Sequence, residues 1–136
     1  MTSWNDSLLI GVKLIDEQHF ELIRRMDELV MACKRGDGEQ KVGETLKFVV
    51  SYVNEHFKDE EELQALYKYP DIAAHKKMHE TFIANTIELM QELKVRQCDD
   101  FVDKVKKMLI DWFLRHINSE DRRVGAHIHK SGGDLH

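Results

Sequence analysis

Apolar residues recur at intervals of three and four along four stretches of the chain, the period of one buried helix face. The first stretch begins near Ile15 and ends at the glycine-rich turn 36–38, and the second runs from about Glu39 to about Tyr67. Pro70 closes the second stretch, because a proline disfavours helical backbone in the residue before it. The spacing therefore predicts two long helices in the first half of the chain.

Two more helices are predicted in the second half. One starts at about Asp71, just after the proline, and continues to Leu93, where the polar patch 96–100 interrupts the pattern. The other runs from Val102 to about Val124. No strict alternation of apolar and polar residues indicates strands. Four such helices with short connections predict an all-α fold, an up-down-up-down antiparallel four-helix bundle.

The two ends of the chain lack a sustained helical period. Residues 1–14 carry apolar side chains that can pack, so we expect an N-terminal arm lying on the domain. Residues 125–136 are polar and glycine-rich, which predicts a short, frayed C-terminal tail. The expected organisation is a single domain over 1–136, with its bundle at 15–124.

Composition excludes several classes of protein. The 136 residues carry a net charge of −5 and no basic cluster, which argues against nucleic acid as a partner. No apolar run approaches the ~18 residues that indicate a membrane span. The two cysteines, Cys33 and Cys98, are predicted to be free thiols, and the N-terminus does not resemble a cleaved signal. We expect a cytoplasmic monomer.

Metal-competent side chains fall on the buried stripes of the predicted helices. His56 and Glu60 stand four residues apart, as do His75 and His79, so each pair shares one helix face. An antiparallel bundle places both pairs toward one end. His19, near the start of the first helix, and a histidine late in the fourth helix lie toward that same end. Buried imidazoles facing one another without a cation would be poorly tolerated. The sequence therefore predicts a metal site.

The number of donors favours two metal ions. Five imidazoles with Glu60 and a further carboxylate exceed the four ligands of a zinc site, whereas the donor types fit iron, copper or zinc alike. Helical period favours Glu120 as the second carboxylate, four residues after His116. Asp121, five residues after, is rotated by ~140° from His116 on an ideal helix.

The same residues resemble the hemerythrin family, and in particular its single-domain bacterial branch. The matching motifs are Asp16-x-Gln18-His19, His56-x-x-x-Glu60, His75-x-x-x-His79, His116-x-x-x-x-Asp121 and the entry segment Trp4-x-Asp6. The resemblance covers almost the whole chain and favours Asp121 over Glu120, which then becomes a surface or supporting residue.

The resemblance implies two non-haem iron ions bridged by an oxo or hydroxo group and by two carboxylates. His75, His79 and His116 would then hold one iron. His19 and His56 would hold the other, which keeps a place open for dioxygen. Glu60 and Asp121 would bridge the pair.

Apolar residues near these motifs are candidates for the walls of a dry dioxygen pocket. Phe113, one turn before His116, is the strongest candidate, and the full set is Ile23, Phe82, Trp112, Phe113, Leu114 and Ile117. Asp16 and Gln18 are expected either to hydrogen-bond to ligands or to cap the first helix. The histidines after Val124 are expected to be solvated, namely His127, His129 and His136.

The predicted function is reversible dioxygen binding for oxygen transport, storage or delivery, without catalysis. The partners would be dioxygen and an oxygen-consuming protein. Two alternatives remain open at this point: a di-iron peroxidase or oxidase, and an oxygen or iron sensor.

Overall fold

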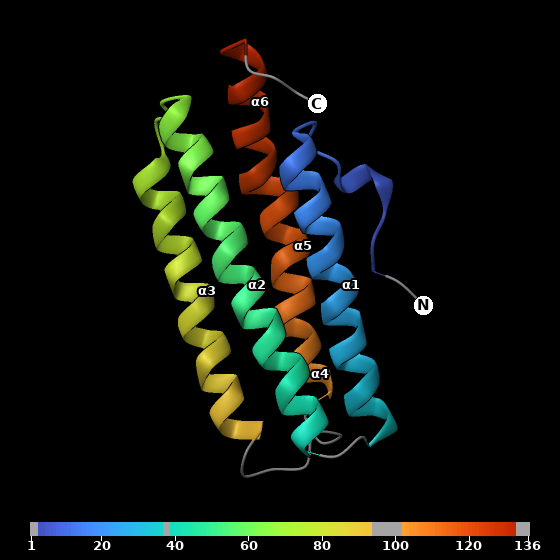
Figure 1. Ribbon diagram of the computed structural model, residues 1–136. Coiled ribbons are helices and arrows are strands. Elements are labelled where there is room, and N and C mark those ends of the chain that lie inside the picture. Colours follow the sequence, from blue (N-terminus) through green and yellow to red (C-terminus); the bar gives the residue numbers. More distant parts are fainter. Residues whose placement is uncertain (1–2, 37–38, 94–101, 133–136) are drawn as a thin grey trace.

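The computed structural model describes residues 3–36, 39–93 and 102–132, and it confirms an all-α four-helix bundle (Figure 1). The first three helices are α1 (Lys13–Arg35), α2 (Glu39–Leu66) and α3 (Ile72–Leu93). The fourth rod consists of consecutive helical segments, which are α4 (Val102–Val105), η3 (Lys106–Asp111), α5 (Trp112–His116), η4 (Ile117–Asp121) and α6 (Arg122–Lys130).

The bundle closes because each helix buries the stripe that its spacing predicts. Leu22, Met26 and Leu29 of α1 are fully buried, as are Val49 of α2 and Leu89 of α3. The α1 helix ends at Gly36, which adopts the left-handed conformation (φ 71°) and donates its backbone N–H to carbonyls of the last turn. The predicted helix boundaries in the first three rods therefore agree with the structure to within a few residues.

Two stretches of the fourth rod are π-helical rather than α-helical. In η4 the backbone N–H of Arg122 donates to the carbonyl of Ile117, five residues earlier. Hydrogen bonds between residues five apart widen the turn, and such turns occur frequently at functional sites. The widening places positions five apart, rather than four apart, on the same face of this rod.

The C-terminal stretch is a helix, so the expected frayed tail is wrong as far as Lys130. Gly125 and Ile128 of α6 are buried. A Cβ atom added to Gly125 would lie 2.7 Å from the Ile10 carbonyl oxygen, so the glycine allows the N-terminal arm to cross α6 at close range. Residues 133–136, and with them His136, lie outside the described part of the chain.

The N-terminal arm lies along the bundle, as expected, and polar contacts fasten it. Asp16 accepts hydrogen bonds from the backbone N–H groups of Ile10 (2.8 Å) and Gly11 (3.1 Å). The guanidinium of Arg122 donates to the carbonyl oxygen of Ser7 at 2.6 Å. Asp16 therefore holds the arm, and it makes no hydrogen bond to a predicted metal ligand among the contacts that the structure gives.

The expectation of free thiols is wrong for Cys33, which is buried and disulfide-bonded. Cys98 lies outside the described residues. The cysteines therefore do not support a cytoplasmic location, which stays a prediction. Over residues 3–36, 39–93 and 102–132, no helix combines the length and apolar character needed to cross a bilayer.

Candidate metal centre

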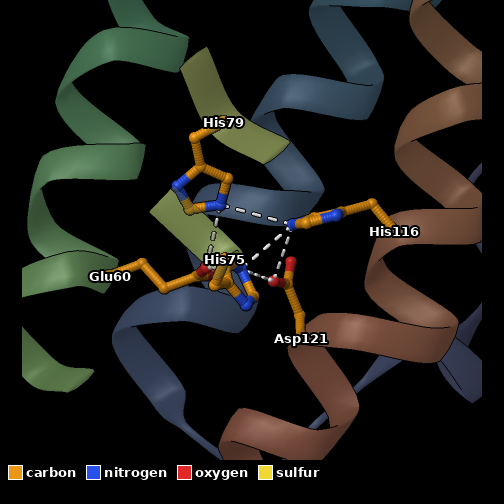
Figure 2. Close-up of side chains that lie close together, drawn as sticks. All are labelled: Glu60, His75, His79, His116 and Asp121. Carbon is orange, nitrogen blue, oxygen red and sulfur yellow. Dashed lines mark hydrogen bonds and ion pairs between the residues drawn. The ribbon is translucent and has the colours of Figure 1, made fainter. Parts of the chain in front are cut away.

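The seven predicted ligands come together inside the bundle, and all are nearly inaccessible to solvent. They form two groups of donor atoms, each within 4.8 Å. One group contains Glu60, His75, His79, His116 and Asp121 (Figure 2). The other contains His19, His56, Glu60 and Asp121, so the two carboxylates belong to both groups.

The first group gathers three imidazole nitrogens around a common point. Nε2 of His116 lies 3.1 Å from Nε2 of His75 and 3.3 Å from Nε2 of His79 (Figure 2). Nε2 of His75 is 2.7 Å from Oε1 of Glu60 and 3.0 Å from Oδ1 of Asp121. Converging nitrogens and oxygens at such distances are the arrangement expected of donors that surround a cation.

The second group uses the other oxygen of each carboxylate. Oδ2 of Asp121 is 3.0 Å from Nε2 of His19. Oε2 of Glu60 is 3.9 Å from Nε2 of His19 and 3.8 Å from Nε2 of His56. Together, the two carboxylates therefore present one oxygen each to the group of His75, His79 and His116, and their other oxygens to the group of His19 and His56.

The π-helical turn of η4 (here called the π-turn) explains why Asp121, and not Glu120, is in the cluster. Oδ1 of Asp121 lies 3.1 Å from Nε2 of His116, five residues earlier. Glu120 is part-exposed and lies 3.6 Å from the guanidinium of Arg123. Glu120 was favoured on the spacing of an ideal helix, which has about 3.6 residues per turn. The wider turn of η4 changes which side chain faces inward.

Several donor atoms of the cluster lack a hydrogen-bond partner of good geometry within the described part of the chain. They include Nε2 of His19 and of His56, Oε2 of Glu60 and both carboxylate oxygens of Asp121. Buried polar atoms are almost always paired, and each exception calls for an explanation such as an ion. The residues therefore fit a centre that holds cations.

The protonation of the imidazoles depends on their surroundings. Burial lowers the pKa of His56 to about 3, and the neighbouring His19 ring acts in the same direction, so His56 is neutral and can donate a lone pair. Burial also opposes a proton on His75, but the carboxylates of Asp121 and Glu60 outweigh it and raise the pKa to about 10. A bound cation would replace that proton.

Other side chains fix the orientation of two ligand rings. The amide of Gln18 hydrogen-bonds to Nδ1 of His56 at 2.7 Å, and the carboxylate of Glu61 hydrogen-bonds to Nδ1 of His79 at 2.9 Å. The Phe57 ring stacks on His79 with 3.7 Å between centroids. Gln18 was expected to support a ligand or cap the helix, and the first alternative agrees with the structure.

Some of these supporting residues were not predicted from the sequence. Asp59 and Glu61, the acidic neighbours of Glu60, were not singled out, although they hydrogen-bond to Gln18 and His79. Gln64, fully buried four residues after Glu60, was not considered, although it donates to Oε1 of Glu60 at 3.3 Å. Its position on the same helix stripe as Glu60 was the available signal.

Two of the six candidate pocket residues, Phe113 and Trp112, lie against ligand rings. The Phe113 ring is 5.5 Å from the His19 ring and 6.0 Å from the His56 ring, between centroids. Trp112 instead stacks on His116 at 4.6 Å and on Phe82 at 4.3 Å. Ile23 and Ile117 are fully buried in the core, and Leu114 is partly buried against it.

The histidines of α6 do not join the cluster. His127 is half-buried, and its Nε2 donates to the backbone carbonyl of Tyr67 at 2.6 Å, so the expectation that it is solvated is wrong. His129 is exposed and lies next to Gly11.

Comparison with known proteins gives a consistent set of relatives. Residues 10–128 match the model of the hemerythrin HHE cation binding domain. The chain is 37% identical to a bacteriohemerythrin of Stenotrophomonas maltophilia, over 97% of this chain and 91% of that protein. It is 26% identical to the myohemerythrin of Theromyzon tessulatum, over 87% and 86% of the two chains.

A solved structure shares the fold. The crystal structure of a wild-type hemerythrin superposes with a TM-score of 0.80 at 23% identity, covering 94% of this chain and 98% of that one.

Proposed function

The chain belongs to the hemerythrin family, and from that premise we propose that it binds dioxygen reversibly at a non-haem di-iron centre. The observation that carries the proposal is the division of each carboxylate between two groups of imidazoles. Oε1 of Glu60 and Oδ1 of Asp121 together face His75, His79 and His116, whereas Oε2 and Oδ2 together face His19 and His56. Two cations bridged by both carboxylates would use every one of these oxygens.

The ligand assignment follows from the two groups. We assign His75, His79 and His116 to one iron and His19 and His56 to the other. Glu60 and Asp121 would bridge the two. The position held by His19 and His56 has one imidazole fewer than the other, so it would leave a coordination place open for dioxygen. The two irons would supply the electrons for reversible dioxygen binding.

The surroundings of the two-imidazole position support a binding role. The Phe113 ring packs edge-on against His19 and is fully buried, so it covers this position with an apolar surface. Water stabilises the charged products of oxidation, and excluding it disfavours their release. Phe113 is therefore the pocket residue that we assign to protecting bound dioxygen, with Phe82 behind it at 6.2 Å.

We propose that the protein carries, stores or delivers dioxygen to an oxygen-consuming protein and does not act as an enzyme. The ligand set supports this role, because five neutral imidazoles and two carboxylates supply less negative charge than carboxylate-rich di-iron sites. Lower charge makes strongly oxidising chemistry less favourable.

Stopped-flow mixing of the reduced, iron-loaded protein with dioxygen tests the function. We expect a stable oxygenated form whose visible bands disappear under argon and return on re-exposure to air. Rapid turnover with reductant and peroxide, without a stable oxygenated form, would instead indicate a peroxidase or oxidase. A reduced protein whose spectrum does not respond to dioxygen would contradict the proposal.

A further inference from the structure

We propose that Gln18 and Glu61 are positioning residues that make the two metal positions unequal, so that the three-imidazole position binds its cation more tightly. The inference rests on the proposed two-metal centre. It concerns the hydrogen bonds on the outer side of the ligand rings, where a carboxylate supports one imidazole and a neutral amide supports another.

Glu61 supports His79 of the three-imidazole group. Oε2 of Glu61 accepts a hydrogen bond from Nδ1 of His79 at 2.9 Å, and the Glu61 side chain is 25% exposed. Because a carboxylate only accepts, the proton must lie on Nδ1, which leaves the lone pair on Nε2 free for a cation. A charged acceptor also draws this proton away from the ring, and that makes the imidazole a stronger donor.

Gln18 supports His56 of the two-imidazole group. The Gln18 Nε2 donates to Oδ2 of Asp59 at 2.7 Å, and this contact fixes the orientation of the amide. Its Oε1 therefore accepts from Nδ1 of His56, also at 2.7 Å. The result is the same tautomer as in His79, held by a neutral acceptor. His56 is consequently the weaker donor of the two.

The remaining contacts leave this contrast in place. In the part of the chain that the structure describes, Nδ1 of His19 and Nδ1 of His75 have no hydrogen-bond partner. One such ring belongs to each group, so they do not offset the difference between Glu61 and Gln18. The three-imidazole group thus has both one more ring and the carboxylate-supported ring.

Titration of the metal-free protein with zinc alone tests the inference without requiring oxygen chemistry. We expect the wild type to bind two zinc ions in two resolved steps. Glu61→Gln keeps the size of the side chain and removes its charge, and it should weaken the tighter step by about tenfold or more. The weaker step should change by less than about threefold.

The reverse exchange provides a second variant. Gln18→Glu combined with Asp59→Asn places a carboxylate beside His56 and an amide beside that carboxylate, which avoids two adjacent negative charges. We expect this double variant to strengthen the weaker step by about tenfold. Glu62→Gln and Glu55→Gln are the matched controls, since both residues are exposed on α2, and neither should alter either step.

Nuclear magnetic resonance gives a readout that a purely structural role would not move. In the zinc-loaded wild type, the Nδ1 proton of His79 should resonate further downfield than that of His56, because its acceptor is charged. Glu61→Gln should shift the His79 proton upfield with little change at His56. Unchanged binding steps in Glu61→Gln, or weakening of the second step alone, would overturn the inference.

The outcomes also separate this inference from the proposed function. Binding that stops at one zinc per chain would overturn both. Two zinc steps that respond as described, in a protein whose iron form fails to bind dioxygen reversibly, would remove the function and leave the inference standing.

Discussion

At the end of the bundle near Gly36, the core is built from apolar side chains such as Leu29, Leu46 and Leu89, whereas the opposite end buries imidazoles and carboxylates. Figure 1 shows both ends spanned by the same four rods. Burying a leucine side chain contributes about 1.5–3 kcal/mol to folding. Burying unpaired polar groups opposes folding. The apolar end therefore stabilises the fold that holds the polar end together.

The largest effect should follow from removing a carboxylate that both metal positions share. Asp121→Ala deletes one oxygen from each group, so we expect metal content to fall from two ions per chain to one or fewer. Metal analysis of the purified variant measures this. Asp103→Ala, an exposed change near the apolar end, is the control and should retain both ions. An Asp121→Ala protein with two ions would show that this carboxylate is not a ligand.

Metal removal should distinguish the two ends by their stability. Cations at the proposed site would bind the folded state, so a free metal concentration one hundred times the dissociation constant should stabilise that state by about 2.7 kcal/mol for each site. Without metal, amides flanking His56 and His116 should exchange with solvent faster, while those around Leu46 keep most of their protection. Hydrogen exchange with and without a chelator measures the difference. Equal loss at both ends would mean that the site does not unfold as a local unit.

Truncating one buried side chain at each end of the bundle separates effects on the free energy of unfolding from effects on the oxidation of the iron centre. Phe113→Ala should lower the free energy of unfolding by about 3–5 kcal/mol and Leu46→Ala by about 2–5 kcal/mol, because each leaves a cavity. Only Phe113→Ala should also speed the oxidation of the iron centre in air, since it opens the cover over His19. Denaturant titration and the decay of the visible bands give the two readouts. Equal oxidation rates would remove Phe113 from the pocket.

The smallest effect is expected from the carboxylate next to Asp121. Glu120→Gln should leave the metal content unchanged and alter the free energy of unfolding by less than about 0.5 kcal/mol. Metal analysis and thermal unfolding beside the wild type check both statements. Loss of an ion in this variant would favour the ideal-helix spacing over the π-turn.

Much of the bundle was predictable because burial follows a regular period. The stripe through Leu22, Met26 and Leu29 indicated a helix. The histidines of all four helices were predicted to lie toward the same end of the bundle, and this indicated where the site lies. The contribution of Asp121 was not predictable from period alone, since a π-turn has no simple signature in residue spacing. It was predicted only through the resemblance to a family.

The C-terminal helix and the residues that support the ligands show a second limit of prediction from the sequence. The sequence 125–136 is polar and glycine-rich, but its first part continues α6 to Lys130, and Gly125 allows the arm to cross this helix at close range. The hydrogen bonds of Asp59 and Glu61 depend on partners in other helices, Gln18 of α1 and His79 of α3. Contacts between distant segments are set by tertiary packing, which local pattern does not encode.

The metal content and visible spectrum of protein expressed with sufficient iron show whether the two groups of donors hold a pair of irons. We expect two irons per chain and charge-transfer bands that change when the reduced protein meets dioxygen. Zinc as the only metal, with a featureless spectrum, would contradict this expectation.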